Sequence, residues 1–207
     1  MNHNIRLDYP DERESLYSLD EINNELSIIG TKACVLDLND VSEELIQLLN
    51  KQTLSKNEKD KIMDHFLLPI DKLLNIIDDA GRKPHVEGGG ELSTTVTTFG
   101  YSYPQFYLAE KGVDYSRFDN LHINISNDGT GVDEVLQFVS GKEFVMHQYL
   151  PDKKVLKVHF SCADEYTGWI ITYNGKNPHI GSLTSASIGT KLIVQVIGPK
   201  EWEMKYI

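Results

Sequence analysis

Three histidines in the C-terminal half have the residue type and spacing of a metal site. They are His122, His147 and His159, and Glu143 stands close to the second of them in the chain. An imidazole that is neutral at pH 7 binds first-row metals through a ring nitrogen, and a carboxylate commonly completes such a site. The sequence therefore predicts a divalent first-row metal (Fe, Zn, Ni or Mn) held by these four side chains.

Alternation of apolar and polar residues predicts how two of these histidines meet. Residues 143–150 and 155–162 both alternate as strands do, and the short segment between them is typical of a hairpin. Pairing Leu150 with Leu156 brings the apolar faces together and sets the two histidines of these strands opposite each other on the other face. A shift of two residues would make them diagonal neighbours, and a shift of one would bury His147.

The third histidine stands in another strand-like run. In residues 121–126 the apolar side chains of Leu121, Ile123 and Ile125 share one face, which we expect to be the core face, and His122 shares the other. His122 joins the other two histidines if this strand belongs to the same sheet. The alternative is that the three histidines are exposed to solvent, or hydrogen-bonded to neighbours, on a polar sheet face.

An aromatic segment supplies candidate pocket residues. Residues 99–107 are rich in aromatic side chains, and from them we predict that Tyr101, Tyr103 and Phe106 line a pocket together with Tyr149. Such rings either close the end of a barrel or line a ligand pocket.

The chain around His122 resembles part of a known metal-binding motif. His122-Ile123-Asn124, then Glu134, six further residues and Gly141, is similar to the first cupin motif, in which histidines and a glutamate bind a metal inside a double-stranded β-helix. The sequence departs from that motif because Asn124 replaces its second histidine and the gap from histidine to glutamate is longer. No second cupin motif is recognised around residues 178–181. The resemblance implies a cupin-like barrel with a bound metal.

The order of predicted elements indicates an α+β protein. Residues 1–18 are expected to be a polar lead-in, residues 19–83 a mainly helical region, and residues 84–207 an all-β barrel or sandwich domain. We expect the helical segment to pack on or beside an antiparallel barrel or sandwich, most simply a cupin-like double-stranded β-helix.

Periodicity places the individual elements. Helices are predicted over about 19–29, after Asn39-Asp40, and from Ser55 toward Asp79 with a break at Pro69. Strand-like runs of alternating or β-branched residues are 32–38, 94–99, 105–110, 120–126, 135–140, 143–150, 155–162, 168–174, 191–197 and 201–207.

Composition excludes several classes of function. The chain has 207 residues, 31 acidic and 20 basic, and a formal net charge of −11, so a nucleic acid would be repelled. No apolar run approaches the roughly 20 residues that span a bilayer, and the N-terminus has no signal-peptide pattern, so we expect a cytoplasmic protein outside the membrane. The two cysteines, far apart in the chain, do not indicate a disulfide framework.

Two functions fit these observations. The first is a metal-dependent enzyme or small-molecule-binding protein of cupin-like architecture. The second is a non-catalytic acidic protein, an inhibitor or immunity-type protein, that masks a basic partner. The sequence leaves the substrate and the oligomeric state open.

Overall fold

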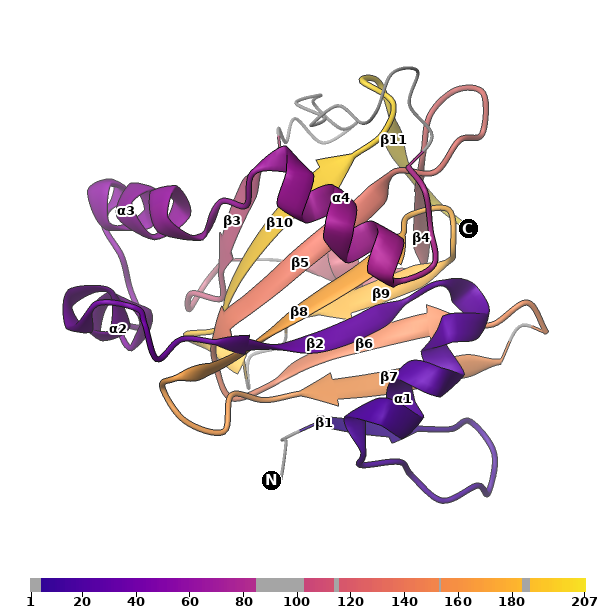
Figure 1. Cartoon of the computed structure of the whole chain (residues 1–207), viewed down its shortest axis with the longest axis horizontal. Coiled ribbons are helices and arrows are strands. Elements are labelled where there is room, and N and C mark those ends of the chain that lie inside the picture. Colours follow the sequence, from indigo (N-terminus) through magenta and orange to yellow (C-terminus); the bar gives the residue numbers. More distant parts are fainter. Residues whose placement is uncertain (1–4, 85–102, 114–115, 153, 184–186) are drawn as a thin grey trace.

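Two antiparallel β-sheets stacked face to face form the body of the protein in the computed structural model (Figure 1). The structure describes residues 5–84, 103–113, 116–152, 154–183 and 187–207. The first sheet has the strand order β1-β7-β6-β9-β4-β11, and the second has the order β2-β8-β5-β10-β3.

Each sheet draws its strands from distant parts of the chain. The first sheet consists of β1 (Ile5–Asp8), β4 (His122–Ile125), β6 (Phe144–Tyr149), β7 (Val155–Phe160), β9 (His179–Ser182) and β11 (Glu203–Tyr206). The second consists of β2 (Lys32–Asp37), β3 (Gln105–Leu108), β5 (Asp133–Ser140), β8 (Thr167–Asn174) and β10 (Lys191–Ile197). The regions expected to be a lead-in and a helical segment thus each supply an edge strand, β1 and β2.

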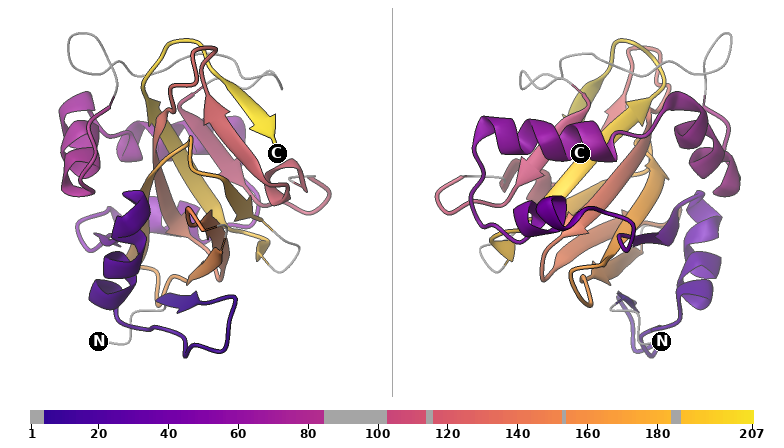
Figure 2. Two further views of the ribbon diagram at one scale, coloured as in Figure 1. Left: turned by 90° about the vertical axis from the view of Figure 1, so that its right-hand side faces the viewer. Right: turned by 60° about the vertical axis from the view of Figure 1, so that its left-hand side comes forward.

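The helices lie outside the sandwich (Figure 2). They are α1 (Leu19–Leu26), α2 (Glu43–Leu49), α3 (Lys56–Phe66) and α4 (Ile70–Asp79), with short 3₁₀ turns at Ser27–Ile29 and Ser116–Asp119. The segment from Ser55 to Asp79, predicted to be helical with a break at Pro69, forms the two helices α3 and α4. Pro69 takes the N-cap position of α4, and its lack of an N–H interrupts the series of helical hydrogen bonds. No helix in the described ranges is long and apolar enough to cross a membrane.

Local signals account for the helix starts. Ser55 and Glu58 form a reciprocal capping box at the start of α3. The α2 helix begins after Ser42, whose hydroxyl accepts a hydrogen bond from the Leu45 amide. This cap lies two to three residues beyond the predicted cap at Asn39-Asp40. Ser18 precedes α1 as predicted, but its side chain makes no capping hydrogen bond.

The second sheet is buried on both faces. Its inner face meets the first sheet in an aromatic core of Phe138, Phe144, Phe160 and Trp169. Its outer face is covered by α2, α3 and α4, which pack on Leu108, Val135, Val139, Ile193 and Ile197. This two-sided burial explains why β5 and β10 are almost continuously buried rather than alternating.

The β6–β7 hairpin has the predicted faces but a different register. Gln148 pairs with Leu156, so the strands are shifted by two residues from the predicted pairing of Leu150 with Leu156. The Leu150 amide instead donates to the Lys154 carbonyl oxygen and closes the turn. A shift of two keeps every side chain on its predicted face.

Candidate functional site

A pocket lies between the two sheets and is polar at one end. Its volume is about 50 Å³. The polar groups come from β4, β9, β5 and β8 and are His122, Asn124, His179, Glu134 and Tyr173. The remaining walls are mostly apolar or aromatic and include Tyr103, Tyr107, Phe118, Leu136, Phe144, Met146, Leu183, Leu192, Val194 and Met204.

Two histidines face each other at the polar end. His122 and His179 are paired across β4 and β9, and their ring centroids lie 4.4 Å apart. In each ring, Nδ1 donates a hydrogen bond over 2.7 Å to the backbone carbonyl oxygen two residues earlier, that of Asn120 or Asn177. Because a carbonyl oxygen only accepts, Nδ1 carries the proton and Nε2 keeps a free lone pair.

Burial keeps both imidazoles neutral. It lowers the pKa of His179 to about 4, and burial with the nearby His179 ring lowers the pKa of His122 to about 4. No described residue donates a hydrogen bond to either Nε2 atom. Two uncharged lone-pair donors are therefore available in the pocket at pH 7.

A buried carboxylate lies beside the histidines. Glu134, the second residue of β5, is 4% exposed. Its Oε1 accepts from Asn124 Nδ2 at 2.7 Å, and its Oε2 accepts from the Tyr173 hydroxyl at 2.9 Å. Among described residues no lysine or arginine forms an ion pair with it, and burial raises its pKa.

Gly175 makes room for this carboxylate. A Cβ at Gly175 would come 2.8 Å from Glu134 Oε1 and 2.8 Å from Asn124 Cβ. The Asn124 amide also donates to the Gly175 carbonyl oxygen at 2.7 Å. Only glycine allows the turn after β8 to approach β4 and Glu134 this closely.

The donor set suits a divalent first-row cation. Imidazole nitrogens and a carboxylate bind such metals, and an imidazole whose other nitrogen is fixed by a backbone carbonyl is typical of metal ligands. His179 Nε2 lies 3.8 Å from Glu134 Oε1. Within the described ranges, however, no group of three or more His, Cys, Asp or Glu side chains is already arranged to hold a metal ion.

The predicted four-residue metal set is not brought together. His122 is on the inner face, whereas His147 pairs with Lys157 and His159 with Val145 on the outer face of the same sheet. His159 Nε2 there lies 3.0 Å from Asp8 Oδ2, and its Nδ1 lies 3.5 Å from Glu143 Oε1. The prediction that the rings of His122, His147 and His159 converge is therefore wrong. The reason is that β4 turns its polar face inward, opposite to the predicted orientation.

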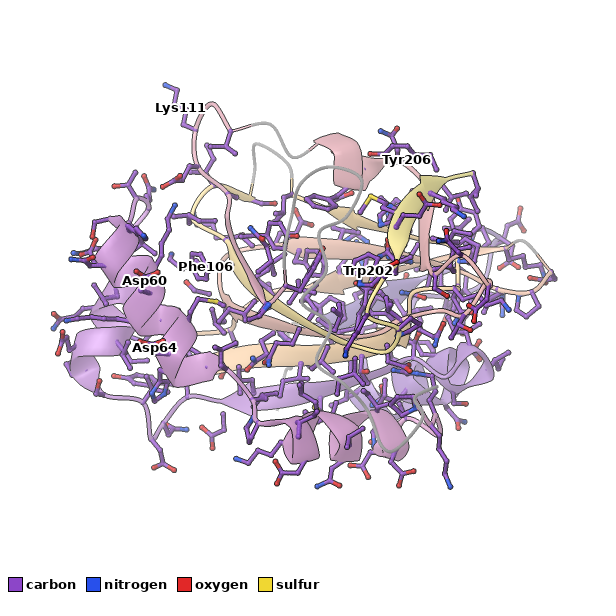
Figure 3. All side chains as sticks on the ribbon, turned by 90° about the horizontal axis from the view of Figure 1, so that it is seen from above. Asp60, Asp64, Phe106, Lys111, Trp202 and Tyr206 are labelled. Carbon is purple, nitrogen blue, oxygen red and sulfur yellow. The ribbon has the colours of Figure 1, made fainter. Side chains whose placement is uncertain are left out.

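The predicted pocket residues divide in the same way. Tyr103 lines the pocket. Phe106 packs on the outer face of the second sheet with the apolar side chains of α2 and α3, and Figure 3 shows it on the side of Asp60 and Asp64. Tyr149 lies on the outer face of β6. Tyr101 and the predicted strand 94–99 lie outside the described residues.

The sequence predicts Glu134 as part of the cupin-like motif but predicts Glu143 as the carboxylate ligand of the metal. It gives no prediction for His179. The rings of His122 and His179 are held by the backbone carbonyl oxygens of Asn120 and Asn177, and because every residue type has such an oxygen, the sequence carries no signal for this contact. The β9 strand itself is only four residues long and includes Gly181, so it shows no clear alternation.

Comparison with known proteins bears on the fold. No family model matches the sequence, and no curated protein matches it. Among solved structures, an acireductone dioxygenase from Bacillus anthracis with a cadmium ion in its active centre superposes with a TM-score of 0.60. The match covers 97% of this chain and 96% of that one at 13% identity.

The chain has a cupin-like fold. The predicted fold class, an α+β protein with a helical segment on an antiparallel cupin-like sandwich, is confirmed. At this identity the likeness to the acireductone dioxygenase concerns the fold alone.

Proposed function

We propose that the pocket binds a divalent first-row metal through Nε2 of His122, Nε2 of His179 and the carboxylate of Glu134. The protein would then be a metal-dependent enzyme or binding protein that acts on a small molecule. The observation that carries this proposal is the pair of imidazoles, each fixed with Nε2 unprotonated, beside a buried carboxylate with no described cationic partner.

Electrostatics supports a cation at this place. A buried carboxylate without a counter-charge is costly, and here the cost appears as the raised pKa of Glu134. A divalent ion would favour the ionised form of the carboxylate and needs no proton to leave the histidines. Asn124 and Tyr173 use only part of the roughly four lone-pair sites of a carboxylate, so each oxygen still has capacity for a metal.

The surrounding residues have distinct roles in this proposal. The backbone carbonyls of Asn120 and Asn177 orient the imidazoles, and Asn124 and Tyr173 orient the carboxylate. The apolar walls limit access of water to the polar end. A bound metal would supply Lewis-acid chemistry toward a small molecule. The cadmium reported in the active centre of the structurally similar dioxygenase supports the choice of a metal.

Metal analysis of protein purified without a histidine tag tests the proposal. After loading with Fe²⁺, Zn²⁺, Ni²⁺ or Mn²⁺ and removal of excess, we expect about one ion per chain for at least one metal. His122→Ala and His179→Ala should each weaken binding by about tenfold or more. His147→Ala is the matched control, because it removes an imidazole from the outer face of the same sheet.

Two results would contradict the proposal. One is wild-type protein that holds none of these metals at stoichiometry. The other is loss of metal in His147→Ala together with retention of metal in His179→Ala, which would favour the outer-face histidines instead.

A further inference from the structure

We infer that Asn124 selects the ligand of this pocket, by accepting a hydrogen bond from a hydroxyl or N–H group on a small, otherwise apolar molecule. The inference deepens the proposed function and rests on it for the location of the chemistry. It assigns a specificity-determining residue and a ligand class.

The orientation of the Asn124 side chain is fixed by its neighbour. Its Nδ2 donates to Glu134 Oε1 at 2.7 Å, so Oδ1 is turned away from the carboxylate. The side chain lines the pocket and is 2% exposed. Its Oδ1 is buried and has no hydrogen-bond partner.

The neighbouring polar groups do not supply the missing donor. Nε2 of His122 and Nε2 of His179 carry no proton in the tautomers that their backbone contacts set. The Tyr173 hydroxyl already donates to Glu134. Buried acceptors in native proteins are almost always satisfied, so the donor to Asn124 is expected to enter with the ligand.

The walls and volume define the rest of the ligand. Leu136, Met146, Leu192 and Val194 offer no polar partner, and no described residue that lines the pocket is a lysine or arginine. A charged tail would therefore be buried without compensation. The pocket of about 50 Å³ has room for roughly four water molecules, so the part of the ligand inside it has only a few non-hydrogen atoms.

Three probes of five non-hydrogen atoms test this ligand class. Butan-1-ol has a donor and an apolar tail, its isomer diethyl ether has no donor, and 2-methoxyethanol has the donor but a more polar tail. We expect butan-1-ol to bind wild-type protein about fivefold or more tightly than either of the others, by ligand-observed NMR titration. Ether binding equal to that of butan-1-ol would overturn the inference.

The Asn124→Leu variant separates Asn124 from the other acceptors. We expect it to bind diethyl ether at least as well as the wild type and to lose the preference for the alcohol. A preference that persists in this variant would assign it to the histidines or the metal and overturn the inference. If the variant does not fold, the wild-type side-chain carbonyl ¹³C signal of Asn124 decides, since butan-1-ol should shift it and diethyl ether should not.

Each titration is run on Zn²⁺-loaded and on metal-free protein. If the protein binds neither zinc nor another first-row metal, the proposed function is contradicted. A preference for butan-1-ol that depends on Asn124 in the metal-free protein would still support the ligand class. Stoichiometric metal without that preference contradicts the inference alone.

Discussion

At the scale of single residues, burial controls the protonation of the pocket. His122 and His179 both have a folded-state pKa of about 4, against 6.5 for a free imidazole, and burial is the largest cause in each. The pKa of Glu134 is shifted in the opposite direction, because burial raises the pKa of a carboxyl group. All three groups are thereby driven toward their neutral forms unless a cation enters the pocket.

The histidines should make stability fall as the pH falls. Between pH 6.5 and about 4 the unfolded chain takes up a proton at each imidazole and the folded protein does not. The free energy of unfolding should therefore decrease by up to about 1.4 kcal/mol per pH unit for each histidine and level off below about pH 4. Urea unfolding of metal-free protein at pH 7, 6 and 5 measures this slope.

A variant isolates the contribution of the histidines. Glu134 acts in the opposite direction, since its raised folded-state pKa adds stability as the pH falls. The double variant His122→Gln, His179→Gln keeps Glu134 and should show a clearly flatter dependence. An identical slope in the wild type and the double variant would show that the pocket histidines are not buried as described.

At the scale of elements, the alternation rule misassigns the orientation of β4, one of the four strands that form the candidate site. In β4 the side chains of His122 and Asn124 are buried, and those of Ile123 and Ile125 are only partly buried. The β4 strand therefore turns its polar face toward the pocket, between two otherwise apolar inner faces. By contrast β6 and β7 contribute mainly packing, and there the alternation predicted every face.

Register depends on information that alternation lacks. A shift of two residues preserves all faces, so only the turn after β6 fixes the alignment, through the bond from Leu150 to Lys154. The sequence gives no sign of β9 because its four residues include Gly181 and show no clear alternation. The helices and the long central strands were predictable because their apolar spacing repeats, over about two or more turns in a helix and over two or more pairs of residues in a strand.

The turn that joins β8 to β9 is expected to tolerate only glycine at position 175. Gly175→Ala would push a methyl group against Asn124 and Glu134 Oε1, both 2.8 Å away. We expect the free energy of unfolding to fall by about 1–3 kcal/mol and metal affinity to fall as Glu134 moves. Gly181→Ala is the control, because the closest atoms to its Cβ are 3.6 Å away in Phe144. Equal destabilisation of the two variants would argue against the described packing.

A buried ion pair fastens the end of α4 to the second sheet. Arg82 Nε lies 2.7 Å from Asp133 Oδ1, with side-chain exposures of 11% and 2%, and the guanidinium also donates to Thr172 Oγ1. Arg82→Met would leave the buried carboxylate of Asp133 without a counter-charge and with only the Asn174 amide, 3.3 Å from Oδ1, as a side-chain donor, which should cost about 3–5 kcal/mol in urea unfolding. Arg13→Met removes the exposed pair with Asp11 and the contact of the guanidinium with the Tyr9 ring, and it should lower the free energy of unfolding far less than Arg82→Met does. A small loss in Arg82→Met would mean that Asp133 finds another partner.

At the scale of the whole molecule, the site joins the two sheets. His122 and His179 belong to the first sheet and Glu134 to the second, so the fold itself brings His179 to two residues that are more than 40 positions earlier in the chain. The α+β class and the sandwich followed from the order of elements in the sequence, but this convergence needs the pairing of β4 with β9, which no local pattern encodes. The basic protein partner that the net charge of −11 suggests stays a prediction, which a salt-dependent association rate would support.

Because the proposed metal would bridge both sheets, it should stabilise the entire sandwich and not only the pocket. At a free metal concentration of a hundred times Kd, binding to the folded state alone adds about 2.7 kcal/mol. For a chain of 207 residues this corresponds to a rise in Tm of about 5–11 °C over chelator-treated protein. Differential scanning calorimetry with and without Zn²⁺ measures the rise, which His147→Ala should retain and His179→Ala should lose. An equal rise in His179→Ala would place the stabilising metal elsewhere on the molecule.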